Sequence, residues 1–157
     1  MTTNNNLIAK VSNGFGNQMF LYATSYAFSK KMDYTLLLDI ETGIKNLKKL
    51  DSKKKFKHYE PKFELDIFKL SAKKADKNYR FDFFFGYITK KIIYFLDKIS
   101  NKKRTISEIK KKDKKTSFDN NLLKNNFSSN VYIDGYFESE KYFNEYRQEL
   151  LKEFSFK

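Results

Sequence analysis

Two glycines and a pair of side-chain amides follow the first apolar run of this chain. The run Leu7–Val11 has the character of a buried strand, and residues 12–18 read Ser-Asn-Gly-Phe-Gly-Asn-Gln. A glycine turn between a strand and a helix points free backbone N–H groups at a phosphate. Glycine also lets the backbone approach a ligand closely, and amide side chains donate to phosphate or sugar oxygens. The spacing therefore predicts an anion-binding junction made by Gly14, Gly16, Asn17 and Gln18.

An ordinary tight turn is the alternative, because the third glycine of a dinucleotide fingerprint is missing. A second junction of the same kind lies near the end of the chain, where the apolar run Val131–Asp134 is followed by Gly135 and Tyr136. Ligands of open α/β sheets bind at the carboxyl ends of strands, where such junctions gather.

The segments around the first junction predict an α/β fold. Apolar residues recur at helical spacing from Asn17 to Lys31, and Tyr34–Asp39 is a second apolar run. A strand, a helix and a strand in this order form a βαβ unit with parallel strands. A last helix is predicted after Glu138 or Ser139, with Tyr142, Phe143, Tyr146, Leu150, Leu151 and Phe154 on its buried face.

The middle of the chain gives weaker patterns. We expect residues 41–78 to be irregular, Lys102–Lys115 to be a solvated charged segment, and Asn120–Asn130 to be a polar loop. The aromatic stretch Tyr79–Ile99 is predicted to be helical. It suits either an interfacial amphipathic helix or a core helix with lysines at its edges, and we favour the core helix.

Composition limits the classes of function. The chain of 157 residues has no cysteine and a single histidine, His58, so a zinc–thiolate site, a histidine metal cluster and a histidine-based triad are not expected. The net charge is +13, and residues 45–115, with 24 Lys/Arg against 9 Asp/Glu, carry a balance of +15. Such a segment is attracted to an anionic membrane or a polyanion, although a bias toward lysine in the composition has the same result. No nucleic-acid-binding module is recognisable.

The N-terminal residues lack the basic and apolar regions of a signal peptide. We therefore expect a cytoplasmic protein, with peripheral attachment to the inner face of the membrane as the alternative that the basic segment leaves open.

Both junctions resemble segments of the α-1,2-fucosyltransferase family. Residues 14–23 read Gly-Phe-Gly-Asn-Gln-Met-Phe-Leu-Tyr-Ala, which is similar to the family's Gly-Leu-Gly-Asn-Gln-Met-Phe-Gln-Tyr-Ala. Residues 135–143 read Gly-Tyr-Phe-Glu-Ser-Glu-Lys-Tyr-Phe, which is similar to its Gly-Tyr-Trp-Gln-Ser-Glu-Lys-Tyr-Phe. Asn13 stands where the family has a further glycine. The resemblance covers residues 7–39 and 131–156.

The resemblance implies a glycosyltransferase of the GT-B type with paired Rossmann-like halves. Such an enzyme transfers fucose from GDP-fucose to the 2-hydroxyl of a galactose-terminated glycan, without a metal or another cofactor. It also implies that Gly14, Gly16, Asn17 and Gln18 bind the donor and that Tyr136 lines the cleft. Asp134 and Glu140 are then the candidates for the catalytic base that an inverting transfer needs.

One family motif is absent from the chain. The segment His-x-Arg-Arg-Gly-Asp, whose arginine contacts the donor nucleotide, does not occur before Lys157. We therefore expect residues 1–157 to be a single Rossmann-like domain, the N-terminal half of a longer enzyme, with a basic variable insert at 41–130, and inactive as it stands. A basic peripheral membrane or polyanion-binding protein without catalysis is the alternative.

Overall fold

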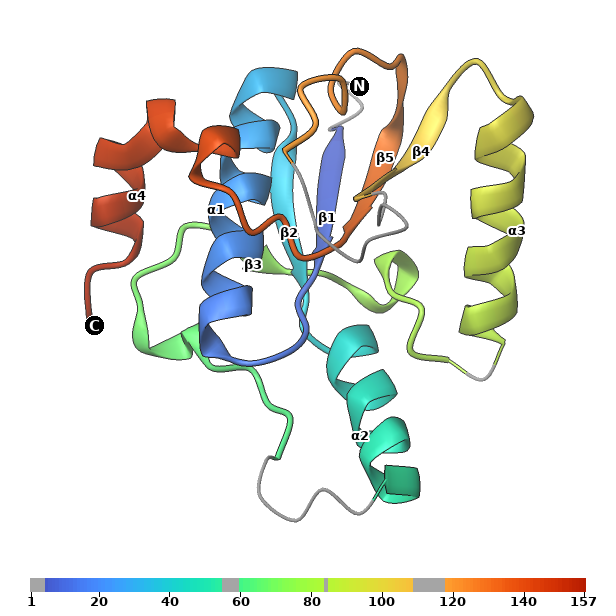
Figure 1. Ribbon diagram of the computed structural model, residues 1–157, viewed down its shortest axis with the longest axis horizontal. Helices are drawn as coiled ribbons and strands as arrows, with labels where there is room; N and C mark the ends of the chain where they lie inside the picture. The colour runs from blue at the N-terminus through green and yellow to red at the C-terminus, as the bar shows by residue number, and fades with distance from the viewer. Residues whose placement is uncertain (1–4, 55–59, 84, 109–117) are drawn as a thin grey trace.

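The computed structural model describes residues 5–54, 60–83, 85–108 and 118–157. It contains a sheet of five parallel strands (Figure 1): β1 (Asn6–Lys10), β2 (Thr35–Asp39), β3 (Lys73–Lys74), β4 (Lys103–Ser107) and β5 (Phe127–Asp134). The order across the sheet is β3-β2-β1-β5-β4. The predicted α/β class and the βαβ unit are thus confirmed, since β1 and β2 are parallel neighbours joined by a helix.

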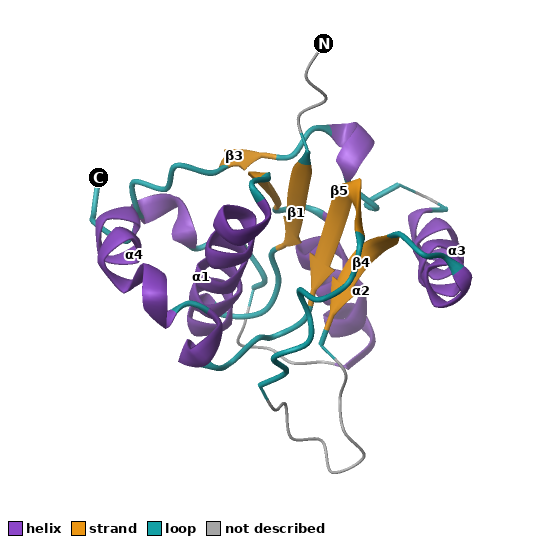
Figure 2. Ribbon diagram, turned by 90° about the horizontal axis from the view of Figure 1, so that it is seen from above, coloured by secondary structure: helices purple, strands orange, loops and turns teal. Residues whose placement is uncertain are grey.

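Helices lie on both faces of the sheet. The helices are α1 (Phe15–Met32), α2 (Thr42–Lys54), α3 (Gly86–Ile99) and α4 (Arg147–Glu153). Figure 2 shows α1 and α4 on one side of the strands and α3 on the other. The strands run downward in Figure 1, so their carboxyl ends form the lower edge of the sheet, and α2 extends beyond that edge.

The alternation of side chains along the strands explains the two-sided core. Leu7 and Ala9 of β1 and Ile133 of β5 are fully buried in the larger cluster together with α1. Ile8 and Tyr132 belong to a smaller cluster on the opposite face. By the same alternation, Lys10 and Asp134 at the ends of these strands belong to the face that α3 covers.

Helix α1 is the central helix of the larger core, and α4 is attached to its outer side. Residues 21–29 of α1 are all buried, because the sheet packs on one side of the helix and the C-terminal segment on the other. The Tyr26 hydroxyl donates to Glu149 of α4 at 2.8 Å, and the Tyr22 hydroxyl donates to Glu153. Burial and these carboxylates raise the pKa of both phenols, so both remain protonated donors.

Several expectations for the middle of the chain are wrong. Residues 41–78 are not irregular throughout, because they contain α2 and β3, and β4 lies within the segment that was expected to be solvated. Segment 41–130 therefore contributes β3, β4 and the first residues of β5 to the same sheet. The polar loop expected over Asn120–Asn130 ends at Asn126, because β5 begins at Phe127, earlier than predicted. His58 and residues 109–117 lie outside the described residues.

The predicted final helix is also shorter than expected. Its first part forms two 3-10 turns, Glu140–Tyr142 and Asn144–Tyr146, and Leu151, which was assigned to the buried face, is exposed. None of the helices in the described parts of the chain is both long enough and apolar enough to cross a membrane.

Candidate functional site

The two predicted junctions follow neighbouring strands. β1 pairs in parallel with β5, in a register that sets Ala9 against Ile133, so the next residues, Lys10 and Asp134, meet at the carboxyl edge. The strand order reverses between β1 and β5, because β2 and β3 lie on one side of them and β4 on the other. Ligands of open α/β sheets bind at such a reversal. The site that the fold itself favours is therefore the edge where Lys10 and Asp134 lie.

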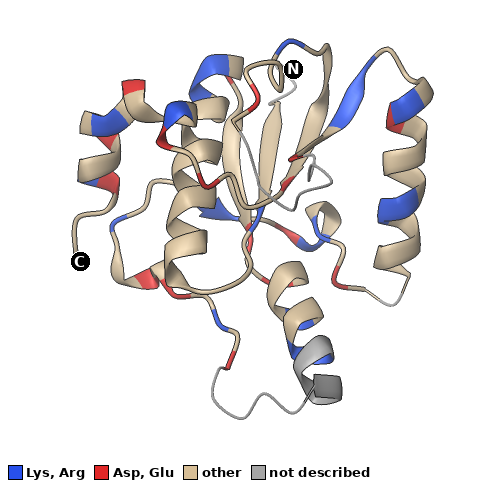
Figure 3. Ribbon diagram, in the orientation of Figure 1, with Lys and Arg blue, Asp and Glu red and all other residues tan. Residues whose placement is uncertain are grey.

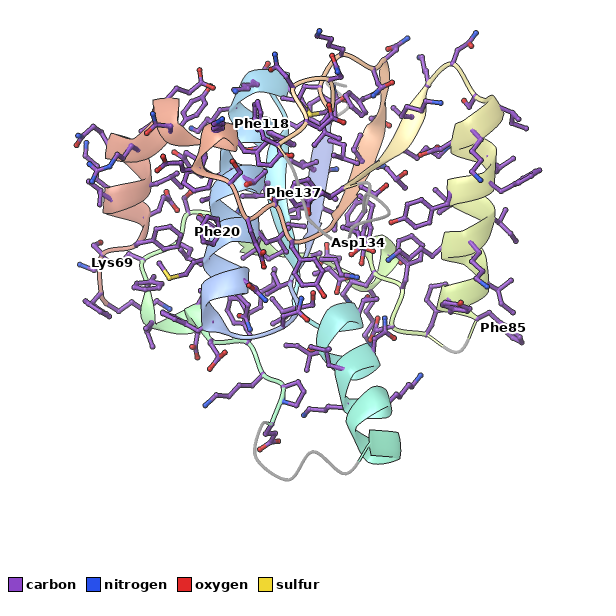
Figure 4. All side chains as sticks on the ribbon, in the orientation of Figure 1. Phe20, Lys69, Phe85, Phe118, Asp134 and Phe137 are labelled. Carbon is purple, nitrogen blue, oxygen red and sulfur yellow. The ribbon has the colours of Figure 1, made fainter. Side chains whose placement is uncertain are left out.

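Asp134 is the centre of a polar cluster at this edge (Figure 4). Its carboxylate forms ion pairs with Lys10 of β1 and with Lys90 of α3. The Tyr94 hydroxyl, also from α3, donates to Asp134 Oδ2 at 3.3 Å. The Lys90 ammonium lies 5.5 Å from the ring centroid of Tyr94 and 5.4 Å from that of Tyr132. One carboxylate thus holds two lysines from different elements beside aromatic rings.

The electrostatics of this cluster follow from burial and from the excess of positive charge. Burial acts to raise the pKa of Asp134, but Lys10 and Lys90 outweigh it, so the pKa of this carboxyl is lowered. Burial lowers the pKa of the Lys90 ammonium, Lys10 adds to that shift, and Asp134 opposes it. Two ammonium groups face one carboxylate, so the cluster can accept a further negative charge.

A pocket of about 320 Å³ opens next to the cluster. Lys10, Lys90 and Lys91 provide cationic groups in its wall, and Tyr87 and Tyr94 provide rings. The remaining lining residues are Thr42, Asn46, Phe81 and Gly86. Ammonium groups suit phosphate oxygens, and aromatic faces suit a sugar or a base. This pocket was not predicted from the sequence, although Lys10, at the end of an otherwise apolar strand, indicates a polar site there.

Asp39 connects the wall of this pocket to the sheet. Its carboxylate is fully buried and accepts the backbone N–H groups of Glu41, at 3.1 Å, and Thr42, at 2.9 Å, at the start of α2. Its other oxygen accepts the Tyr132 hydroxyl at 2.7 Å. Gly43, in the first turn of α2, has no room for a side chain, because a Cβ would lie 2.1 Å from the Val11 carbonyl oxygen. The first turn of α2 is therefore fixed against β1 and β5.

The first junction has the predicted strand–turn–helix backbone. Of its two side-chain amides, Asn17 and Gln18, the Gln18 amide is used within the fold. Asn13 has φ 66°, a left-handed conformation that asparagine tolerates well. Gly14 precedes the first turn of α1, and space is open around Gly16, where a Cβ would meet no atom within 4 Å. Asn17 is half-buried beside them. Gly14, Gly16 and Asn17 are thus placed where backbone and amide donors can meet a ligand.

Gln18, in contrast, is fully buried and used within the fold. Its Nε2 donates to the carbonyl oxygens of Asn13 and Lys62, both at 2.8 Å, and its Oε1 accepts the Glu64 N–H at 3.0 Å. The bonds to Lys62 and Glu64 join the start of α1 to the segment after α2, and the bond to Asn13 fixes the turn before α1. The Gln18 amide, which was predicted to bind the donor substrate, therefore holds two protein segments together.

The second junction is held by a residue that sequence reasoning did not single out. Glu108 Oε2 accepts the backbone N–H groups of Tyr136, at 3.2 Å, and Phe137, at 3.0 Å. Phe137 is fully buried with φ 52°, an uncommon conformation for a large side chain. Tyr136 is half-buried at this turn, and it is not among the residues that line the 320 Å³ pocket. The turn is thus built in a defined, strained shape.

The two candidate bases do not lie together. Glu140 is exposed on a 3-10 turn whose Tyr142 packs on Phe28 of α1, with ring centroids 5.8 Å apart, on the face opposite to α3. Asp134 faces α3, and its lowered pKa makes it a weak proton acceptor. Among the described residues, no group of three or more His, Cys, Asp or Glu side chains is arranged to hold a metal ion.

Compared with known proteins, the chain matches no protein-family model, no curated protein and no solved structure.

Proposed function

We propose that this chain is the sugar-nucleotide-binding N-terminal half of a GT-B-type α-1,2-fucosyltransferase, which transfers fucose from GDP-fucose to the 2-hydroxyl of a galactoside in surface-glycan synthesis. One observation carries the proposal. The two segments that resemble this family are far apart in the sequence, yet they follow neighbouring parallel strands at one edge of the sheet. A lysine-lined pocket opens at that same edge.

The chemistry of the leaving group suits this pocket. When fucose leaves GDP-fucose, the diphosphate gains negative charge, which fixed cationic and N–H groups stabilise. In our proposal Lys10, Lys90 and Lys91 supply the cationic charge that a metal ion supplies in other transferases. The backbone N–H groups near Gly14 and Gly16 and the Asn17 amide add hydrogen bonds from the positive end of α1.

Asp134 receives a positioning role in this proposal. It holds Lys10 and Lys90 in place through its two ion pairs, and its lowered pKa keeps it ionised for that purpose. Glu140 lies on the other face of the sheet. The proposal therefore assigns the described residues to binding the donor and names no catalytic base among them.

Titration calorimetry with the purified chain tests this proposal. We expect saturable binding of GDP-fucose that is at least about tenfold tighter than binding of UDP-glucose or inorganic diphosphate, because a nucleotide-sugar site adds contacts to base and sugar. GDP and GMP serve as controls that separate the contribution of the diphosphate. Saturable binding of UDP-glucose with none of GDP-fucose would contradict the proposal.

A further inference from the structure

Helix α3 turns an apolar side away from the rest of the molecule. Ile88, Ile92, Phe95 and Ile99 are between 53% and 71% exposed. Their spacing of four, three and four residues places them in one stripe along the helix, and Figure 2 shows α3 at the outer side of the molecule. Phe85, just before the helix, continues this surface and is labelled in Figure 4. We call these five residues the α3 outer face.

The orientation of α3 is fixed by its polar side, which faces the sheet. Lys90 and Tyr94 contact Asp134, as described above. One turn later, the buried Asp97 accepts the Thr105 hydroxyl at 2.6 Å and the Arg104 backbone N–H at 3.0 Å. The helix cannot roll to bury its isoleucines without breaking these contacts. The prediction that Tyr79–Ile99 forms a core helix is therefore wrong, because specific polar partners on β4 and β5 outweigh the apolar pattern.

Lysine and arginine positions occur on α3 and on β4, the strand that follows it (Figure 3). Helical spacing places Lys91 and Lys98 along one flank of the stripe, and the exposed Lys102 and Arg104 follow the helix. Asp97 is the only acidic residue of α3, and it is buried against β4. The outer side of the helix thus combines an apolar stripe with a cationic border and presents no carboxylate of its own.

This combination favours one kind of surface as the partner of the apolar stripe. A second copy of the chain would bring Lys91 and Lys98 against their own counterparts, and each copy carries a net charge of +13. An anionic bilayer accepts apolar side chains at the level of its headgroups and attracts the flanking lysines. We propose that the α3 outer face docks the protein on an anionic membrane surface, with α3 lying along the interface. This inference does not depend on the proposed transferase activity.

Vesicle co-sedimentation of the full chain tests this docking surface. With vesicles of equimolar phosphatidylcholine and phosphatidylglycerol we expect binding that weakens as salt is raised, and with phosphatidylcholine alone we expect at least about tenfold weaker binding, since the lysines are attracted to negative headgroups. The double variant I92S/F95S is expected to lose at least about tenfold in partitioning, because two exposed apolar anchors are removed. The matched control is Leu151→Ser, which removes an equally exposed apolar residue from α4.

Three outcomes would overturn the proposal. They are equal binding to both kinds of vesicle, unchanged binding of I92S/F95S, and a stable dimer in analytical ultracentrifugation that I92S/F95S abolishes. The substituted side chains are exposed, so thermal unfolding should be unchanged, which separates a lost surface from a lost fold. GDP-fucose affinity should also be unchanged in I92S/F95S, so failure of the docking proposal and failure of the proposed function give different results.

Discussion

Replacing Asp134 by alanine is expected to lower the free energy of unfolding by about 3 kcal/mol, because removing one member of a buried ionic cluster leaves the charges of its partners buried without a counter-charge. Lys10 and Lys90 are mostly buried and both pair with this carboxylate. In the variant two ammonium groups would face each other with no counter-charge. Urea denaturation at pH 7 measures the change.

The control for this variant is Glu138→Ala, which removes an exposed carboxylate four residues further along the chain. We expect a change below about 0.5 kcal/mol there, as for other surface substitutions. An equally small change for Asp134→Ala would contradict the assignment of Asp134 as the residue that organises the lysines.

The pH dependence of the same variant has a defined sign. The folded-state pKa of Asp134 is lowered. The contribution of this carboxylate to the free energy of unfolding is therefore fully present above the unfolded pKa of about 4, and it is lost as pH falls through the folded pKa. Wild-type stability should therefore fall more steeply on acidification than that of Asp134→Ala. In the variant Lys90 keeps its buried charge without a partner, so its stability should recover at alkaline pH as that lysine loses its proton.

Replacing Lys90 by methionine is expected to weaken GDP-fucose binding at least about tenfold, because a charge-assisted hydrogen bond to phosphate contributes about 1.5–3 kcal/mol. Methionine keeps most of the apolar stem of the side chain and removes the ammonium group from the pocket. Asp134 retains its ion pair with Lys10, so the cluster is not left without a cation. Calorimetric titration against wild type measures the loss.

The matched control is Lys69→Met, on an exposed lysine that lies beside the C-terminal segment at the left edge of Figure 4, whereas Asp134 lies near the centre. Lys69→Met lowers the net charge of the chain by the same amount as Lys90→Met. The comparison therefore corrects for long-range attraction between the basic chain and an anionic ligand. Equal losses of affinity in both variants would mean that the attraction is general and that the pocket is not the binding site.

The sequence predicted those parts of the fold that follow from apolar periodicity. β1, α1, β2 and the end of β5 lie where their patterns place them, because these elements are buried and their apolar spacing reports that burial. β4 was missed because an edge strand needs few apolar residues. Within it only Ile106 is buried, and lysine and arginine precede that residue.

Side-chain partners explain what periodicity did not predict. The pattern of α3 shows an amphipathic helix but not which side faces the body, and that orientation depends on Asp134, Thr105 and the backbone of Arg104, which are distant in sequence. Gln18 resembles a ligand-binding amide in sequence, and its role as a link to Glu64 depends on a chain segment far from it. Such pairings arise only when the sheet brings the segments together.

The most direct test of the central claim, that the carboxyl edge of β1 and β5 binds a sugar nucleotide, is to map GDP-fucose on the chain by amide chemical-shift perturbation. We expect saturable shifts at Lys10, Gly14, Gly16, Lys90 and Gly135, which belong to elements that meet at this edge. Phe156 and its neighbours near the C-terminus should not shift. The absence of saturable shifts at the edge, or shifts confined to another surface, would show that this edge does not bind the sugar nucleotide.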